Sequence, residues 1–227
     1  MRKAKMLAVF FAVMGVLAGC SKFSPEETTV SVGKDGKITA AVIDTLDQNY
    51  YQADELKTEL DKAIAAYNSS AGEDTIQVDK FEIEEGNVSL FMKYAAYKDY
   101  AAFNNVTFYA GDISDGYNNG GFRFETTFQQ IENGEVVKDT VTREEIFAGT
   151  NHSMIIFQEP MAVEVPGKIL YASSDLTITG KKSARPSELD KETETSGETE
   201  VLEIAPAQEV TESETSAKMT LYYIIYD

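Results

Sequence analysis

The sequence predicts an α+β fold made mostly of antiparallel strands, with one principal helix and short extra helices. Short segments of alternating apolar residues, bounded by Gly, Asn and Asp, fill most of the chain and are typical of strands. Only one long segment has the three- and four-residue apolar spacing of an amphipathic helix. Tight turns separate successive strand segments, and such turns connect antiparallel neighbours.

The chain begins with the layout of a secretory signal peptide. Arg2, Lys3 and Lys5 form a positive amino-terminal region, and residues 6–17 form a short apolar segment. A membrane-spanning helix needs about 20 apolar residues, so this segment is too short to be one. Cys20, the only cysteine of the chain, follows closely. We therefore expect residues 1–19 to be a cleaved leader.

The order Leu17-Ala18-Gly19-Cys20 resembles the lipobox of bacterial lipoproteins. In that family the cysteine thiol receives a diacylglyceryl group, signal peptidase II cuts before the cysteine, and the cysteine becomes the first mature residue. The resemblance implies a stable two-chain lipid anchor on Cys20, at the extracytoplasmic face of the cell membrane. From residue 28 onward the chain loosely resembles uncharacterised lipoproteins of Gram-positive bacteria, which have no assigned activity to transfer.

The charge of the chain limits its partners. Residues 1–19 contribute three basic side chains to the formal charge of −18, so the mature chain carries −21. Such an acidic surface repels phosphate backbones, so we expect no nucleic-acid partner. With Cys20 lipidated no internal disulfide is possible, and stability must come from a packed core.

The mature chain divides into a tether, one domain and an acidic loop. Residues 20–29 are small, polar or charged and suit a tether between lipid and domain. Residues 184–216 contain ten acidic and two basic side chains and no aromatic residue. Such a segment cannot bury enough apolar surface to become ordered, so we expect a disordered loop. A single α+β domain then comprises residues 30–183 and 217–227.

The first predicted elements are a hairpin and the principal helix. Residues 28–32 and 37–43 alternate as strands around Gly33-Lys34-Asp35-Gly36, whose glycines permit a tight turn. A helical stripe follows and ends at Gly72; its apolar members are Leu56, Leu60, Ala63, Ile64 and Tyr67. Strands are expected over 76–83 and 88–94, with a change of parity at Asp79-Lys80 that indicates a bulge.

The second half of the domain is predicted to be rich in strands. A short helix is expected over 95–104, a strand over 106–109, and another strand that contains Phe122, Phe124 and Phe128. Thr142 and Glu145 have the spacing of a helix capping box. Four further apolar strands are expected over 154–157, 161–165, 169–172 and 176–178. Residues 218–227 carry large apolar side chains on both faces, which indicates an inner strand.

Five tyrosines form the candidate ligand-binding surface: Tyr94, Tyr97, Tyr100, Tyr109 and Tyr117. Tyrosines at this density can offer stacking faces to a sugar or to a protein groove. The alternative is a helix packed on the sheet, with each hydroxyl at the boundary with water. The absence of tryptophan weakens the sugar interpretation.

No catalytic residue or cofactor is predicted. His152 is the only histidine, and no mature thiol is present to join it in a zinc site. The loop 111–122 offers Asp112, Asp115, Asn118 and Asn119 to a hard cation, but its spacing does not match an EF-hand, and turn chemistry explains the same residues. We therefore predict no metal. Acid pairs are too abundant in this chain to identify a hydrolytic dyad.

Three functions compete at this point. The first is a non-enzymatic, lipid-anchored envelope protein with an interaction or structural role and an envelope protein or glycan partner. The second is an extracytoplasmic ligand-binding module for a glycan, peptide or cation, and the third is an envelope hydrolase. A hydrolase would require a concave site with coupled carboxylates, or His152 with an acid partner.

Overall fold

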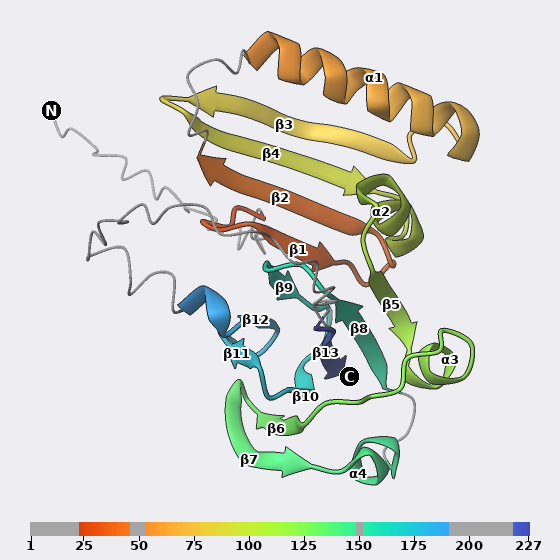
Figure 1. The fold of residues 1–227 in the computed structure, drawn as a ribbon, viewed down its shortest axis with the longest axis vertical. Helices are drawn as coiled ribbons and strands as arrows, with labels where there is room; N and C mark the ends of the chain where they lie inside the picture. Colours follow the sequence, from red (N-terminus) through yellow and green to blue (C-terminus); the bar gives the residue numbers. More distant parts are fainter. Residues whose placement is uncertain (1–22, 46–52, 149–151, 191–219) are drawn as a thin grey trace, which may run out of the picture.

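The computed structural model of the chain describes residues 23–45, 53–148, 152–190 and 220–227 (Figure 1). The leader, Cys20 and residues 191–216 of the predicted acidic loop lie outside the described residues. Two mostly antiparallel sheets with accompanying helices confirm the predicted α+β class. Within the described ranges, no helix is long and apolar enough to cross a membrane.

The strands form a seven-stranded and a six-stranded sheet. The seven-stranded sheet has the order β11 (Leu176–Ile178), β12 (Ser183–Pro186), β9 (Ala162–Glu164), β1 (Thr29–Val32), β2 (Ile38–Thr45), β4 (Asn87–Tyr94) and β3 (Ile76–Glu84). The six-stranded sheet has the order β5 (Phe108–Asp112), β8 (Ser153–Phe157), β13 (Tyr222–Tyr226), β10 (Ile169–Ser173), β6 (Phe128–Glu132) and β7 (Glu135–Val141). Only the β1 and β9 pair is parallel among these described pairs.

Two apolar cores separate the layers. The inter-sheet core lies between the two sheets and includes Val30, Ile38, Met92, Ile155, Phe157 and Ile224. The second core lies on the other face of the six-stranded sheet and includes Phe128, Ile146, Met154, Ile156, Tyr223 and Ile225. α3 (Ile113–Asn118) and α4 (Arg143–Ala148) supply buried isoleucines to this second core. The far sides of α3 and α4 are therefore on the opposite side of the molecule from the seven-stranded sheet.

β13 joins the two cores, as its alternating sequence predicts. All five of its residues are buried, and it pairs with β8 on one side and β10 on the other. Tyr222, Ile224 and Tyr226 enter the inter-sheet core, while Tyr223 and Ile225 enter the second core. The prediction that the last apolar segment forms an inner strand is confirmed.

The principal helix, α1 (Ala53–Ala71), lies along β3 and has no fully buried residue (Figure 1). Its predicted stripe is half buried, because Leu60, Ile64 and Tyr67 pack against the inter-sheet core. α2 (Tyr97–Asn104) is shorter and buries Tyr100. α1 therefore covers the inner side of the seven-stranded sheet at β3, and α2 lies against β4 of that sheet and β5 of the six-stranded sheet.

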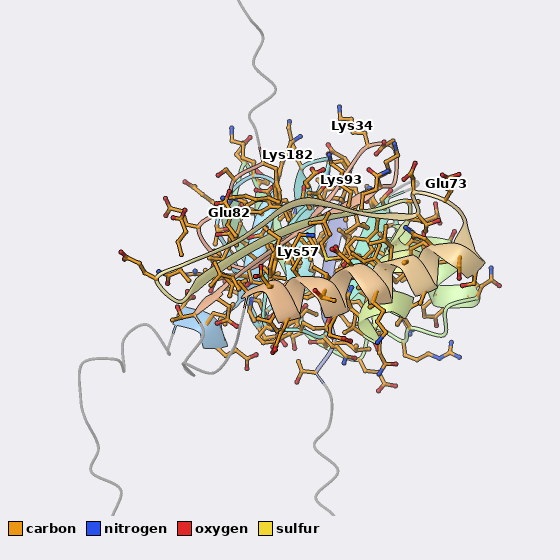
Figure 2. The ribbon with its side chains drawn as sticks, turned by 90° about the horizontal axis from the view of Figure 1, so that it is seen from above. Lys34, Lys57, Glu73, Glu82, Lys93 and Lys182 are labelled. Carbon is orange, nitrogen blue, oxygen red and sulfur yellow. The ribbon has the colours of Figure 1, made fainter. Side chains whose placement is uncertain are left out.

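The opposite side of the seven-stranded sheet is its outer face, which lies away from both cores. The register places Ser31, Thr39 and Lys93 next to one another on neighbouring strands, one residue out of phase with buried Val30 and Met92. Figure 2 shows Lys93 on the side of the molecule opposite to α1. The outer face therefore has no helix or second sheet against it among the described elements.

Local turn and cap predictions are confirmed. Gly36 has φ +80 in the β1–β2 turn, a conformation that favours glycine. The β3–β4 register shifts between Val78 and Lys80, at the predicted bulge. At α4 the Thr142 hydroxyl accepts from the Glu145 amide at 3.3 Å, and the Glu145 carboxylate accepts from the Thr142 amide at 2.9 Å.

The predicted strand through Phe122 and Phe124 is wrong. β6 begins only at Phe128, and Phe124 has a left-handed backbone with φ +55. Phe124 is 6% exposed and contacts Tyr223 at 5.2 Å between ring centroids. The aromatic residues alternate because they fill the second core from a loop, so a period of two does not here indicate a strand.

Two predicted domain boundaries need correction. The tether 20–29 is too long, because Phe23 contacts Phe91 at 6.1 Å and Thr29 already belongs to β1. The acidic loop does not begin at residue 184, because β12 extends to Pro186 and Ala184 is fully buried. Composition missed both segments because backbone pairing, which any sequence can make, holds much of them in place.

We predict that Ile224→Ala is strongly destabilising. Its side chain is fully buried in the inter-sheet core, so the variant should lose about 2–5 kcal/mol through lost burial and a cavity. Val137→Ala is the control, because Val137 is 52% exposed and should change stability by at most about 0.5 kcal/mol. Chemical denaturation measures both free energies, and equal losses in the two variants would contradict the double burial of β13.

Candidate functional site

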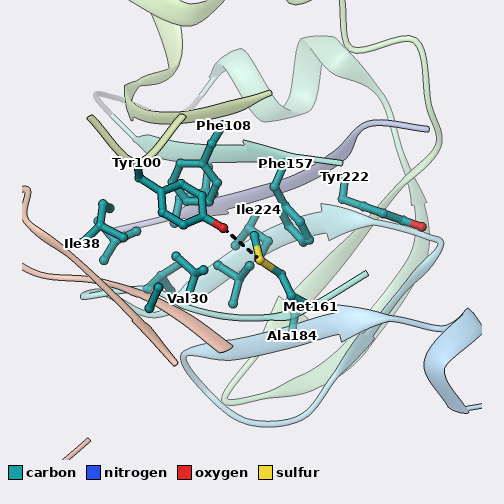
Figure 3. Packing of buried hydrophobic residues seen from close by; sticks show 14 of the residues in the cluster. Val30, Ile38, Tyr100, Phe108, Phe157, Met161, Ala184, Tyr222 and Ile224 are labelled. Carbon is teal, nitrogen blue, oxygen red and sulfur yellow. Dashed lines mark hydrogen bonds between the residues drawn. The ribbon is translucent and has the colours of Figure 1, made fainter. Parts of the chain in front are cut away.

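The structure buries three of the five predicted binding tyrosines. Tyr94, Tyr100 and Tyr109 are only 2%, 7% and 6% exposed. Figure 3 shows Tyr100 inside the inter-sheet core, where its hydroxyl donates to the Met161 sulfur at 3.5 Å. These three residues cannot offer a ring to a ligand, so the predicted five-tyrosine surface is corrected in favour of the core-packing alternative.

The buried rings pack against one another edge to face. Tyr100 lies 5.2 Å from Tyr94 and 4.9 Å from Phe108, measured between ring centroids, and Tyr109 lies 5.3 Å from Tyr97. Such pairs contribute about 0.5–1.5 kcal/mol beyond the area that they bury. Burial also raises the pKa of Tyr94, Tyr100 and Tyr109, so their hydroxyls stay protonated.

Tyr117 is partly exposed and lies beside two arginines. The guanidinium carbons of Arg123 and Arg143 lie 5.9 and 5.8 Å from the centre of its ring, within the range of cation–π attraction. Arg143 also donates to the Tyr117 hydroxyl at 3.5 Å. Phe147 contacts the ring at 5.3 Å. We call these four residues the Tyr117 surface.

Two short helices hold this surface in place. Asp112 caps α3 by accepting from the Ser114 and Asp115 amides at 2.8 and 3.3 Å, and Tyr117 follows in the same helix. The capping box fixes the start of α4, where Arg143 is the first residue. Sequence reasoning missed both arginines because no motif connects them to Tyr117, and because Arg143 lies 26 residues further along the chain.

Clefts lie on both sides of the Tyr117 surface. One of about 310 Å³ is lined by Ser114, Tyr117, Asn118, Arg143, Glu144 and Phe147. Another of about 360 Å³ is lined by Arg123 with Phe122, Glu125, Leu221 and Tyr223. Exposed guanidinium groups beside aromatic rings can bind a carboxylate or phosphate and stack on an apolar group of the same ligand.

A larger groove of about 580 Å³ contains three lysines: Lys34, Lys168 and Lys182. Lys182 donates to the Pro166 carbonyl at 2.7 Å, and the groove also contains the carboxylate of Asp227, which accepts from the Lys168 amide at 2.5 Å. The Pro166 carbonyl and the Asp227 carboxylate therefore already occupy part of this groove, which leaves less positive charge to bind an anion. In the Tyr117 surface Arg143 pairs with Glu144 at 3.6 Å, but both side chains are exposed and such pairs are weak, so the Tyr117 surface is the better candidate.

The predicted cation loop is folded around internal hydrogen bonds. The Ser114 hydroxyl and amide lower the pKa of the Asp112 carboxyl, while Asp115 accepts from Asn119 at 2.6 Å and from Tyr109 at 3.2 Å. The described part of the chain contains no cluster of three or more His, Cys, Asp or Glu that could hold a metal. Turn and cap chemistry thus accounts for these side chains.

Three carboxylates lie near buried tyrosines. Burial raises the pKa of Glu159 and Asp175, and each has one buried oxygen that finds no hydrogen-bond partner in the described part of the chain. Glu188 accepts from the Tyr222 hydroxyl at 2.9 Å and adds to the raised pKa of Asp175. These carboxylates line none of the three clefts above. His152 is partly buried, and its backbone carbonyl accepts from Ile113.

No protein-family model matches the chain, and no curated protein or solved structure is significantly similar to it.

We predict opposite effects of neutralising two aspartates. The pKa of Asp175 is raised in the folded state, so its ionisation opposes folding once the pH exceeds the unfolded value near 3.8. Asp175→Asn should therefore raise the melting temperature at pH 7 by a few degrees, on the order of 1 kcal/mol. The gain should vanish below pH 3.8, where Asp175 is protonated in both states.

Asp190→Asn is the matched comparison. The Thr177 hydroxyl, and after it Arg185, lowers the pKa of Asp190, so its ionisation favours folding above the folded pKa. This variant should lower the melting temperature at pH 7, with a loss that fades in acid. Melting curves between pH 3 and 7 test both variants. A stabilised Asp190→Asn or a destabilised Asp175→Asn would contradict the assignment.

Proposed function

We propose that the chain is a lipid-anchored cell-envelope protein that acts by binding an anionic partner on the extracytoplasmic side of the membrane. The anchor is supported by the Leu17-Ala18-Gly19-Cys20 lipobox after a leader-like segment. The binding role is supported by the Tyr117 surface, where two exposed guanidinium groups flank an aromatic ring in a chain of formal charge −18. That surface is the observation on which the binding proposal depends.

The chemistry of the Tyr117 surface favours an acidic glycan or an acidic peptide. Both guanidinium carbons lie within 5.9 Å of one ring centre, so the surface offers two cationic groups beside one aromatic ring. Tyr117 and Phe147 add apolar area for a sugar face or a side chain. Stacking and charge together favour a ligand that carries both features over a simple inorganic anion.

We predict that Cys20→Ala abolishes lipid attachment. The thiol is the acceptor of the lipid in the proposed scheme, and no other cysteine can replace it. Full-length parent and variant, expressed in bacteria fed a clickable fatty acid, should show label only in the parent. The variant should also keep its leader and run at higher mass. Equal labelling of the two proteins would overturn the anchor.

We predict that oligogalacturonate, a carboxylated oligosaccharide, stabilises the mature protein. At a concentration ten times Kd the stabilisation is about 1.4 kcal/mol, which corresponds to a melting rise of about 3–6 °C. The double variant Arg123→Gln with Arg143→Gln should lose this rise, while Lys34→Gln in the lysine groove should keep it. Differential scanning fluorimetry measures all three, with a neutral cello-oligosaccharide as ligand control.

Two results would reject the proposed site. An equal melting rise in the double variant would assign binding elsewhere, and an equal rise with the neutral oligosaccharide would remove the role of charge. Both exposed arginines can be replaced without opening a cavity, so the double variant should melt close to the parent without ligand.

A further inference from the structure

The first described residues lie across the outer face of the seven-stranded sheet. Phe23 packs edge-on against Phe91 of β4, with 6.1 Å between ring centroids. Glu27 accepts from Arg185 of β12 at 2.8 Å. β9, β1 and β2 lie between β4 and β12 in the sheet, so residues 23–27 cross several strands.

Hydrogen bonds fix the end of this crossing segment. The Thr28 hydroxyl donates to the Ile43 carbonyl at 2.9 Å and accepts from the Ile43 amide at 3.1 Å. The Thr28 carbonyl accepts from the Ala162 amide at 3.0 Å. Residue 28 is thus bound to β2 on one side and β9 on the other, which leaves the segment little freedom to lift from the sheet.

Burial on the outer face agrees with this cover. Thr29, Ala41 and Phe91 are aligned across β1, β2 and β4, and they alternate with residues that face the inter-sheet core. Ala41 is only 1% exposed and Thr29 only 3%. A small side chain on an uncovered sheet face would remain open to water, so these values indicate that other chain lies over this part of the face.

The position of Phe23 limits how far the domain can stand from Cys20. Only Ser21 and Lys22 lie between them in the sequence. Three residues of fully extended chain reach at most about 11 Å. A lipid at Cys20 would therefore hold the β4 part of the outer face, where Phe23 packs, within about that distance of the headgroups.

We propose that the outer face of the seven-stranded sheet is the membrane-facing side of this protein and lies against the lipid headgroup layer. This inference rests on the proposed lipid anchor and adds an orientation to it. The second core separates the six-stranded sheet from α3 and α4, so the Tyr117 surface lies on the far side and points away from the bilayer. The Tyr117 surface then binds its anionic ligand on the side of the protein that faces away from the membrane.

The tether, and not charge attraction, sets this orientation. Three basic side chains of the outer face are paired with acids: Lys80 with Glu82 at 2.7 Å, Lys93 with Asp79 at 2.5 Å, and Arg185 with Glu27. The face is therefore not a polybasic patch of the kind that binds anionic lipids. The orientation should be the same at low and high salt.

The test uses single introduced cysteines. In the lipidated protein the thiol of Cys20 is blocked, so an added cysteine is the only one that a dye can label. Ser89→Cys places the dye on the outer face, one residue out of phase with Leu90, which packs against the inter-sheet core. Ser69→Cys is the matched serine replacement on the exposed side of α1. Each labelled protein is reconstituted into phosphatidylcholine–phosphatidylglycerol vesicles that contain a headgroup nitroxide quencher.

We expect the dye at residue 89 to be quenched several-fold more than the dye at residue 69, in low and in high salt. Inserting a Gly-Ser spacer of about 20 residues after Lys22, with a mean span of about 25 Å, should abolish the difference. Equal quenching at the two positions in the parent, or stronger quenching at residue 69, would overturn the orientation.

Vesicle flotation separates this failure from failure of the anchor. A parent protein that does not float with the vesicles, or a Cys20→Ser variant that floats equally well, would reject the lipid anchor and the orientation with it. A parent that floats through Cys20 but shows equal quenching rejects the orientation alone.

Discussion

The burial of β13 on both faces is the constraint on which the rest of the structure depends. A strand with alternating tyrosines and isoleucines on both sides cannot lie at a surface without exposing one apolar row to water. The seven-stranded sheet and α2 cover one row, and α3, α4 and the loop around Phe124 cover the other. The chain therefore forms two cores, one on each side of a six-stranded sheet.

The position of the Tyr117 surface follows from the need to cover the second core. α3 approaches β8 so closely that a Cβ at Gly116 would overlap the Met154 methyl group. At this short distance the helix buries Ile113, while Tyr117 lies at the rim of the core. A rim aromatic is apolar on its inner side and open on its outer side, which is the setting in which cation–π contacts form with exposed arginines.

Local signals in the sequence predicted local structure well. The two glycines after β1, the parity change at Asp79-Lys80 and the Thr142–Glu145 capping box each specify a backbone feature within a few residues, and all three are present. The apolar content of β13 also sufficed to predict an inner strand, because apolar side chains on both of its faces must be buried. These features could be predicted because each depends only on residues close together in the sequence or on the composition of a single strand.

Features that depend on distant partners were not predictable. The tyrosines of residues 94–109 carry the same spacing whether they face water or the core, and only the position of the six-stranded sheet decides between them. Arg185 pairs with Glu27 across most of the chain length, so composition alone assigned both residues to unstructured segments. Arg143 reaches Tyr117 only because α3 and α4 cover the same core, and Arg123 approaches it from the loop after α3.

The layered order has a consequence for electrostatics at the membrane. A domain of charge −21 is repelled by anionic headgroups, but exposed charges separated by more than about 8 Å are largely screened at physiological ionic strength. In the proposed orientation the outer face lies within that range, where Lys80, Lys93 and Arg185 are paired with acids, while the acids on α1 lie farther away. The acids on α1 then add little to the repulsion between the domain and the headgroups. Arg123 and Arg143 lie on the far side of both cores and are exposed, although Arg143 also pairs with Glu144, so they can attract an anion that the rest of the acidic surface would repel.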